Sequence, residues 1–336
     1  MTSVAILGAG AWGTALGVHL AERAHARPDV TLWTRDAAQA RAMAKARENA
    51  RYLPGIALPP SLLVSSDLRL ASGAALLLAA TPAAALPGLA SELKAHGARA
   101  PLIWLSKGFV AMAAAPAGVG LAHQLLAPMW PAPVGIASGP TFAEEVARGL
   151  PAALAVAATE PHLANQVAAL LRGDTMRVYQ SDDMAGVEIG GAIKNILAIA
   201  AGASDGLGFG HNARAALITR GLAETGRLSA TLGGKRETLM GLAGLGDLVL
   251  TCTGDLSRNR RVGLALAQGK QLPAILAELG HVAEGVTAAI AARALAAHHG
   301  VEMPICEAVY RVLHENLPAQ LAVEALLQRE PRAERS

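Results

Sequence analysis

The glycine pattern GxGxxG at residues 8–13 follows a short apolar run, Val4–Leu7, and opens a helical stretch. A continuous apolar run is typical of a strand covered on both faces. Between a strand and a helix, Gly8 would make the tight turn, Gly10 would let a pyrophosphate approach the backbone, and Gly13 would let the helix pack on the strand. The helix N-terminus would supply amide donors. The pattern therefore predicts dinucleotide binding, with a tight turn that binds no ligand as the alternative.

Apolar runs of strand length alternate with helical patterns over the first half of the chain. We expect helices at 12–24 and 37–47, and strands at 4–7, 30–33, 75–80, 102–105, 134–137, 153–157 and 176–179. This alternation predicts an α/β fold with a Rossmann-type doubly wound sheet. From Met184 onward nearly everything is helical. We therefore expect two domains, a dinucleotide-binding Rossmann domain at 1–180 and an all-helical substrate-binding domain at 181–336.

Composition narrows the class of protein. Apolar residues make up 52% of the 336 residues and charged residues 16%, which excludes a disordered chain. A net charge of +3 and an aromatic content of 3% give little basis for binding nucleic acid. The chain has two cysteines, Cys252 and Cys306, so a disulfide framework is excluded and a reducing compartment is the default.

One uncharged segment, between Arg69 and Glu92, is long enough to span a bilayer. Pro82 and Pro87 interrupt it, so a buried strand followed by a turn and a helix explains it better. No targeting pattern precedes the first predicted strand. We therefore expect a cytoplasmic protein with no integral membrane segment.

The residues after the second predicted strand bear on the choice of nucleotide. A carboxylate there would bind the ribose hydroxyls of NAD, whereas an arginine would accommodate the 2′-phosphate of NADP. The chain has Arg35 followed by Asp36. Either NAD or NADP is possible, with NADPH slightly favoured by Arg35. Asp36 facing the ribose or beginning the next helix, and Arg35 facing solvent, are the alternatives.

Two further strand ends carry polar residues. Lys107 follows the strand predicted at 102–105, and the segment Ser-Gly-Pro-Thr-Phe-Ala at 138–143 follows the strand predicted at 134–137. In an open α/β sheet these ends line the ligand crevice. Lys107 and Thr141 are therefore candidate ligand contacts, with a surface lysine and a helix-capping threonine as the alternatives.

The segment 187–199 is apolar around nearly its whole circumference, which predicts a buried helix. A lysine on such a helix, here Lys194, is costly unless it is paired or used. Burial would lower its pKa, which suits a proton donor or acceptor. Lys194 is therefore the candidate catalytic residue. An internal ion pair with Glu188 or Asp205 is the alternative.

Three more polar groups follow. Asp247 stands in a glycine-rich apolar segment, and Glu284 stands in a loop next to a helix. The segment Ser-Arg-Asn-Arg-Arg at 257–261 gathers hydroxyl, amide and guanidinium donors at a helix start, where oxyanions bind readily. A solvated basic helix end is the alternative. No Cys/His spacing resembles a metal site and no GxSxG motif occurs, so we expect neither a metal centre nor a serine nucleophile.

Taken in order, these segments resemble bacterial-type NAD(P)-dependent glycerol-3-phosphate dehydrogenase. The resemblance is carried by GAGAWG at 8–13, SGPTFA at 138–143, GGAIKN at 190–195, GLAGLGDLVLTCTG at 241–254 and SRNRR at 257–261. It covers nearly the whole chain. It implies reversible hydride transfer between NAD(P)H and dihydroxyacetone phosphate, giving sn-glycerol 3-phosphate for phospholipid synthesis.

The resemblance also implies a role for each matched residue. Lys194 would be the catalytic acid/base. The substrate contacts would be Lys107, Gly139, Thr141, Lys194, Asp247, Ser257, Arg258 and Asn259. Beside the three glycines of the loop, the cofactor contacts would be Ala11, Trp12, Arg35, Lys107, Ala143, Arg258, Val282 and Glu284. Members of the family vary at the position of Arg35.

Other functions stay open on the residues alone. They are another dehydrogenase of the same architecture, a catalytically silent NAD(P)-binding sensor, and an interaction protein. The SRNRR segment favours a small phosphorylated substrate over other dehydrogenase substrates. A homodimer is the candidate assembly.

Overall fold

The computed structural model describes residues 3–22, 28–280 and 283–329. The strands of its large sheet are β1 (Ser3–Leu7), β2 (Asp29–Trp33), β5 (Leu63–Ser65), β6 (Leu76–Ala79), β7 (Leu102–Trp104), β10 (Val134–Ser138), β11 (Ala152–Ala158) and β12 (Met176–Ser181). Their order across the sheet is β12-β11-β10-β7-β6-β1-β2-β5. Two short hairpins are formed by β3 (Glu48–Asn49) with β4 (Leu53–Ala57) and by β8 (Val110–Ala111) with β9 (Val119–Gly120).

Neighbouring strands of the large sheet are parallel except at one place. β10 and β11 are antiparallel, with Ile136 opposite Ala157, so β11 and β12 run against the other strands. β1 lies between β2 and β6 and is parallel to both. The expected Rossmann-type doubly wound sheet is confirmed, with a reversed pair at one edge that the sequence analysis did not anticipate.

Each of the seven predicted strands forms within two residues of its expected bounds. β5 and the two hairpins were not predicted, because these short strands are partly exposed and leave no continuous apolar run. The helix expected at 12–24 is α1 (Ala11–Ala21), and residue 24 lies outside the described residues. The helix expected at 37–47 is α2 (Ala37–Ala46).

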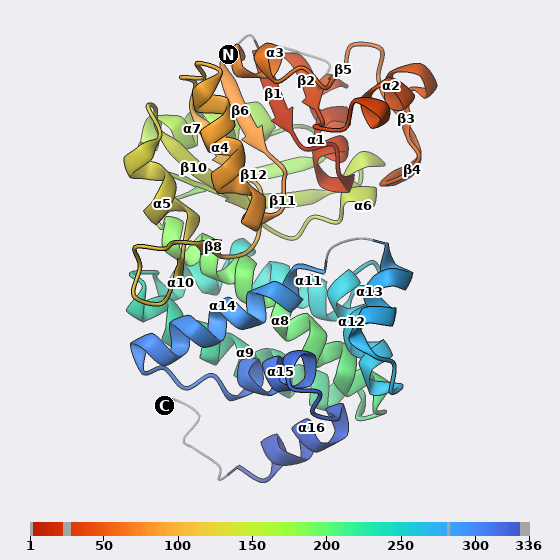
Figure 1. Cartoon of the computed structure of the whole chain (residues 1–336), viewed down its shortest axis with the longest axis vertical. Helices are drawn as coiled ribbons and strands as arrows, with labels where there is room; N and C mark the ends of the chain where they lie inside the picture. The colour runs from red at the N-terminus through yellow and green to blue at the C-terminus, as the bar shows by residue number, and fades with distance from the viewer. Residues whose placement is uncertain (1–2, 23–27, 281–282, 330–336) are drawn as a thin grey trace.

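Helices cover both faces of the large sheet (Figure 1). Val4 and Ile6 of β1 pack in one core cluster with α1 and α7 (Pro161–Leu171). Ala5 and Leu7 pack in another with α4 (Leu86–Ala95) and α5 (Ala122–Met129). Alternate residues of one strand thus face opposite helical layers, as a doubly wound sheet requires. The other helices of this part are α3 (Leu68–Ser72), η1 (Ala83–Ala85) and α6 (Ala143–Ala147).

Beyond β12 the described residues form helices and no strand, and they lie on one side of the sheet part (Figure 1). These helices are α8 (Met184–Gly206), α9 (Gly210–Thr231), α10 (Arg236–Leu239), η2 (Leu242–Gly246), α11 (Asp247–Thr253), α12 (Arg258–Ala267), α13 (Leu272–Leu279), α14 (Glu284–His299), α15 (Pro304–His314) and α16 (Ala319–Leu327). The helical half that the sequence predicts after Met184 is therefore confirmed.

The central element of the helical part is α8. By length and composition it could cross a membrane, but 94% of its apolar window is buried inside the protein, as in a core helix. This is the buried helix that the sequence predicts at 187–199. The uncharged segment between Arg69 and Glu92 contributes β6, η1 and the start of α4, as expected.

The backbones of α8 and α12 are in direct contact. A Cβ on Gly202 would lie 2.0 Å from the carbonyl oxygen of Arg260, and a Cβ on Gly263 would lie 2.0 Å from the carbonyl oxygen of Ile199. Any larger residue at Gly202 or Gly263 would push the helices apart. The two glycines therefore set the closest approach of α12 to α8.

Candidate active site

The glycine loop between β1 and α1 has the geometry that its sequence predicts. Gly8 has a φ of +119°, and a Cβ there would lie 2.8 Å from the carbonyl oxygen of Ala80. A Cβ on Gly13 would lie 2.0 Å from the carbonyl oxygen of Gly8, whereas a Cβ on Gly10 would meet nothing within 4 Å. No side chain caps the N-terminus of α1. The open side of Gly10, next to the first amides of a helix, therefore fits a pyrophosphate.

Two amide side chains donate hydrogen bonds to the backbone of the same loop. Asn49 donates to the carbonyl oxygen of Ala9 at 3.0 Å and to Oγ1 of Thr14 at 2.7 Å. Gln39 donates to the carbonyl oxygen of Ala9 at 2.9 Å, and Thr34 in turn donates to Gln39 at 2.9 Å. Asn49 is fully buried. These bonds fix the loop before any ligand arrives.

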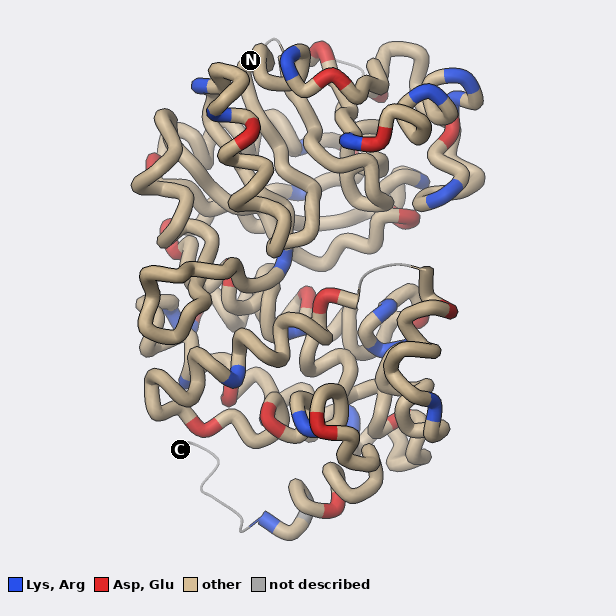
Figure 2. Tube along the Cα trace, in the orientation of Figure 1, with Lys and Arg blue, Asp and Glu red and all other residues tan. Residues whose placement is uncertain are grey.

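The end of β2 resolves the alternatives for Asp36. Its carboxylate accepts from the amides of Ala38 at 2.9 Å and Gln39 at 3.1 Å, so it caps α2. Arg35 is exposed beside it. Figure 2 shows further basic residues over α2 and the β3–β4 hairpin.

Ala11, Trp12 and Ala143 begin two helices, α1 and α6, that pack against each other. Ala11 and Trp12 begin α1, and Ala143 begins α6. All three are partly buried against the same core cluster. Two of the expected cofactor contacts thus follow the glycine loop directly, and the third begins a helix that packs on α1.

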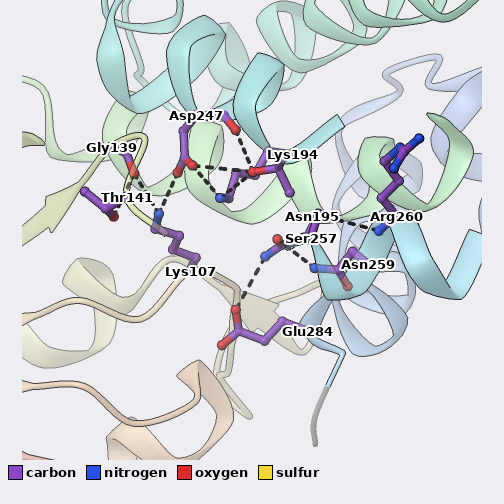
Figure 3. A network of polar contacts seen from close by, with 11 residues as sticks. Lys107, Gly139, Thr141, Lys194, Asn195, Asp247, Ser257, Asn259, Arg260 and Glu284 are labelled. Carbon is purple, nitrogen blue, oxygen red and sulfur yellow. Dashed lines mark hydrogen bonds and ion pairs between the residues drawn. The ribbon is translucent and has the colours of Figure 1, made fainter. Parts of the chain in front are cut away.

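The carboxylate of Asp247 lies between two lysines (Figure 3). Lys107, which follows β7, donates to Oδ2 at 2.6 Å, and Lys194 of α8 donates to Oδ1 at 2.5 Å. This cluster joins the sheet part to the helical part. Lys194 does form the internal ion pair of the alternative, but its partner is Asp247, so the expected partners Glu188 and Asp205 are wrong.

Lys194 is 7% exposed. Burial, assisted by the charge of Lys107, lowers the pKa of its ammonium group from 10.5 to about 8 against the opposing attraction of Asp247. Thr251 accepts a hydrogen bond from Nζ at 2.8 Å and donates its own proton to the main-chain carbonyl of Asp247 at 2.6 Å. Lys194 is thus held in one orientation with a pKa that suits proton exchange near neutral pH.

The segment after β10 packs against the lysine cluster. Lys107 donates to the carbonyl oxygen of Gly139 at 3.0 Å, and the hydroxyl of Thr141 donates to the same oxygen at 3.2 Å. The residue before α6 is Phe142, with no side-chain cap, so the helix-capping alternative for Thr141 is wrong. A Cβ on Gly191 would lie 3.2 Å from Oγ of Ser138, which shows how closely α8 approaches this strand end.

Hydrogen bonds of two asparagine side chains connect the start of α12 to α8 and to the start of α14. Asn259 donates to Oδ1 of Asn195 at 2.9 Å and accepts from the amide of Gly285 at 3.1 Å, and Asn195 donates to Glu284 at 3.5 Å (Figure 3). Burial raises the pKa of Glu284, opposed by the nearby cations Arg258, Lys107 and Lys194.

The first turn of α12 exposes one of its three candidate substrate contacts, whereas Ser257 and Asn259 are buried. Ser257 caps the helix by accepting from the amide of Arg260 at 3.2 Å, and Arg258 is exposed. Val282, the remaining expected cofactor contact, lies outside the described residues.

Metal chemistry was not expected from the sequence. Within residues 3–22, 28–280 and 283–329, no group of three or more His, Cys, Asp or Glu residues is placed to hold a metal ion.

Comparison with known proteins shows the family to which the chain belongs. Two family models match, described as the N-terminus of NAD-dependent glycerol-3-phosphate dehydrogenase over residues 3–164 and its C-terminus over residues 183–324. A glycerol-3-phosphate dehydrogenase (NAD(P)+) of Aromatoleum aromaticum is 54% identical over 336 residues, which cover 98% of this chain and 99% of that protein. The chain belongs to the NAD-dependent glycerol-3-phosphate dehydrogenase family.

Solved structures of the family agree over the full length. The glycerol-3-phosphate dehydrogenase of Coxiella burnetii is 42% identical with a TM-score of 0.92, covering 98% of this chain and 99% of that one. A yeast glycerol-3-phosphate dehydrogenase, from Saccharomyces cerevisiae, is 28% identical with a TM-score of 0.82, covering 97% and 99%. The family fold, sheet part and helical part together, is therefore present in this chain.

Three residues that hold the site together are not apparent from the sequence. Thr251, which orients Lys194, lies within the GLGDLVLTCTG segment but carried no signal of its own. Asn49 and Gln39 hold the glycine loop from 30 to 40 residues away along the chain. Asn49 stands in the short strand β3, three residues after α2, and nothing in the sequence marks it as buried.

Proposed function

We propose that this protein catalyses the reversible NAD(P)H-linked interconversion of dihydroxyacetone phosphate and sn-glycerol 3-phosphate. One observation carries the proposal: the ammonium group of buried Lys194 is held by Asp247 and Thr251. This group lies near the carboxyl ends of β7 and β10, because Asp247 also accepts from Lys107, which follows β7 and donates to the carbonyl oxygen of Gly139 after β10. In open α/β sheets that edge is where ligands bind.

The residues that would hold the nucleotide fit it. The open side of Gly10 and the uncapped start of α1 accept a pyrophosphate, while Gly8 and Gly13 keep strand and helix close. When bound, the nicotinamide cofactor supplies the hydride. The proposed contacts are Gly8, Gly10, Ala11, Trp12, Gly13, Arg35, Lys107, Ala143, Arg258, Val282 and Glu284.

In the direction of reduction, negative charge develops on the ketone oxygen, and Lys194 donates a proton to it from Nζ. With a pKa of about 8, the lysine is mainly protonated at neutral pH yet gives up its proton readily. In the reverse direction neutral Lys194 takes the proton from the hydroxyl group. Lys107, which shares Asp247 with Lys194, and Asn195 on the same helix as Lys194 would orient the reacting oxygen, while Asp247 holds both ammonium groups in place.

The first turn of α12 would bind the phosphate of the substrate. Ser257, Arg258 and Asn259 bring a hydroxyl, a guanidinium and an amide to one helix N-terminus, which suits a dianion. Gly139 and Thr141, which contact each other beside Lys107, would contact the rest of the substrate. The binding energy of the phosphate would hold the small ketone in register with the nicotinamide.

NADPH is the proposed preferred cofactor, by a small margin. Asp36 caps α2 through Oδ1, which turns its carboxylate toward the start of that helix. Arg35 is exposed next to it, and α2 carries the further cations Arg41 and Lys45. A 2′-phosphate would therefore meet positive charge at this position.

The organisation of the protein follows the same lines. We propose a dinucleotide-binding domain at 1–180 and a substrate-binding domain at 181–336, supported by the change from strands to helices between β12 and α8. We further propose that the enzyme acts in the cytoplasm, supplies glycerol 3-phosphate for phospholipid synthesis, and forms a homodimer.

One assay tests the proposed function. Oxidation of NADPH and NADH is followed at 340 nm with dihydroxyacetone phosphate as the substrate. We expect turnover with both cofactors and the higher kcat/KM with NADPH. Absence of turnover with either cofactor, from protein that binds NADPH, would refute the activity. A kcat/KM that is higher with NADH would refute only the cofactor preference.

A further inference from the structure

The segment 257–261 contains a second arginine, Arg260, whose guanidinium group is engaged by two carboxylates. Its Nε and Nη2 lie 2.9 and 2.8 Å from Oδ2 of Asp205, and its Nη1 lies 2.9 Å from Oδ1 of Asp255. Asp205 also accepts from Arg214 of α9 at 2.8 Å. Arg260 therefore differs from its neighbour Arg258, which is exposed at the start of the same helix.

This ion pair lies where α12 crosses α8. The carbonyl oxygen of Arg260 faces Gly202, and Asp205 follows Gly202 by three residues, about one helical turn. Two contacts thus hold α12 on α8 within one helical turn of each other. One is the backbone contact at Gly202, and the other is the fork, in which Nε and Nη2 of Arg260 both contact Asp205. Arg260 and Asp205 side chains are only 13% and 10% exposed, so water screens the pair little.

The two helices carry different halves of the proposed site. Lys194, the proton donor, and Asn195 belong to α8. Arg258 and Asn259, the proposed phosphate contacts, begin α12. The distance between the proton donor and the phosphate contacts therefore depends on how the first turn of α12 is held on α8.

We propose that Arg260 and Asp205 are positioning residues for the reaction: their forked ion pair fixes the phosphate-binding turn of α12 relative to Lys194. This inference rests on the proposed function. An arginine that grips a carboxylate through two nitrogens fixes orientation as well as distance, which a single charge does not. Misplacement of a substrate by about 1 Å can reduce the rate by about 10²-fold.

A purely electrostatic role for Arg260 makes the opposite prediction for one variant. If Arg260 served as a distant positive charge for the phosphate, Asp205→Asn would remove an opposing negative charge and strengthen phosphate binding. If the pair serves to position α12, Asp205→Asn loosens the fork and weakens phosphate binding. The sign of the change therefore separates the two roles.

The experiment compares kcat/KM for dihydroxyacetone phosphate with kcat/KM for unphosphorylated dihydroxyacetone, in the full-length enzyme. The unphosphorylated ketone uses Lys194 but not the phosphate contacts, so general damage to folding lowers both values by the same factor. For Asp205→Asn we expect the ratio of the two to fall by about 10- to 10²-fold, mostly through KM of the phosphorylated substrate. Thermal unfolding of each variant checks that the protein is folded.

Two further variants keep the test decisive. Arg260→Lys retains the charge but not the fork, so we expect the ratio to fall by about tenfold as well. Arg214→Gln removes an ion pair with the same Asp205 from α9 and leaves the fork intact, so we expect a change of about twofold or less, as for an ordinary ion pair.

Provided that the wild-type enzyme is active, two results would overturn the inference. One is a ratio of the two kcat/KM values that is unchanged or higher in Asp205→Asn, and the other is a ratio in Arg260→Lys equal to that of the wild type. The inference is also overturned if Arg214→Gln lowers the ratio as much as Asp205→Asn, because the effect would then be that of the cluster as a whole. Wild-type enzyme that does not reduce dihydroxyacetone phosphate would instead refute the proposed function, and that result is visible before any variant is compared.

Discussion

Removal of the Asp247 carboxylate should move the pH dependence of catalysis in a direction that the structure fixes. Asp247 lies 2.5 Å from Nζ of Lys194 and raises its pKa, while burial lowers it to the net value of about 8. Asp247→Asn keeps the shape of the side chain but removes the attraction. It also leaves Lys107 and Lys194 without the charge that separates them. The pKa of Lys194 should therefore fall further.

The size of this fall follows from the distance. An opposite charge within about 4–6 Å shifts a pKa by about 1–3 units, so the value should drop from about 8 to roughly 5–7. Reduction requires protonated Lys194, so activity is present below its pKa and is lost as pH rises through it. At pH 7 the protonated fraction would change from about nine-tenths to between about one-half and one-hundredth.

The assay is kcat/KM for dihydroxyacetone phosphate as a function of pH. We expect the falling limb of Asp247→Asn to lie about 1–3 pH units below that of the wild type. Asp205→Asn is the matched control, because this carboxylate lies on the same helix as Lys194 but pairs with Arg214 and Arg260. In that control the level of kcat/KM can change, but the position of the limb should not. A limb that stays in place in Asp247→Asn, or moves to higher pH, would refute the coupling.

Three other variants test separate parts of the site. Arg35→Ala should raise KM for NADPH more than KM for NADH, because a charge-assisted contact to the 2′-phosphate contributes about 1.5–3 kcal/mol; equal effects on both cofactors would show that Arg35 does not read the phosphate. Arg258→Ala should lower kcat/KM for dihydroxyacetone phosphate by about 10²-fold, or roughly 3 kcal/mol, with little effect on unphosphorylated dihydroxyacetone; the same loss on both substrates would favour a solvated helix end. Gly10→Val should weaken NADPH binding by about tenfold or more, measured by fluorescence titration, with little change in Tm, because the new side chain fills open space; unchanged affinity would contradict the proposed pyrophosphate site.

The fold was largely predictable because most strands of its sheet are unbroken apolar runs. Residues such as Val4–Leu7 and 134–137 are buried on both faces of the sheet, and that burial leaves an unbroken apolar pattern in the sequence. β5, with three residues and an exposed Leu63, leaves no such pattern. The direction of β11 was not predictable either, because periodicity reports burial and not whether a strand is parallel to its neighbour.

The site was predictable residue by residue but not contact by contact. An apolar helix around Lys194 signals that the lysine is buried, and this much follows from composition. Its partner Asp247 lies 53 positions further along the chain, so only the fold brings them together. Glu188, which shares the helix with Lys194, instead contacts His123 of α5. Sequence neighbours are poor guides to partners in a site built from two parts of a chain.

The central claim is that Lys194 donates the proton to the substrate oxygen. The most direct measurement is kcat for the reduction of dihydroxyacetone phosphate by Lys194→Met, with the Kd for NADPH measured on the same protein. Methionine fills the buried space without the ammonium group. The account predicts a fall in kcat of about 10²–10⁴-fold, with NADPH binding retained because the glycine loop lies on the sheet part. A variant that binds NADPH and keeps a kcat near that of the wild type would contradict it.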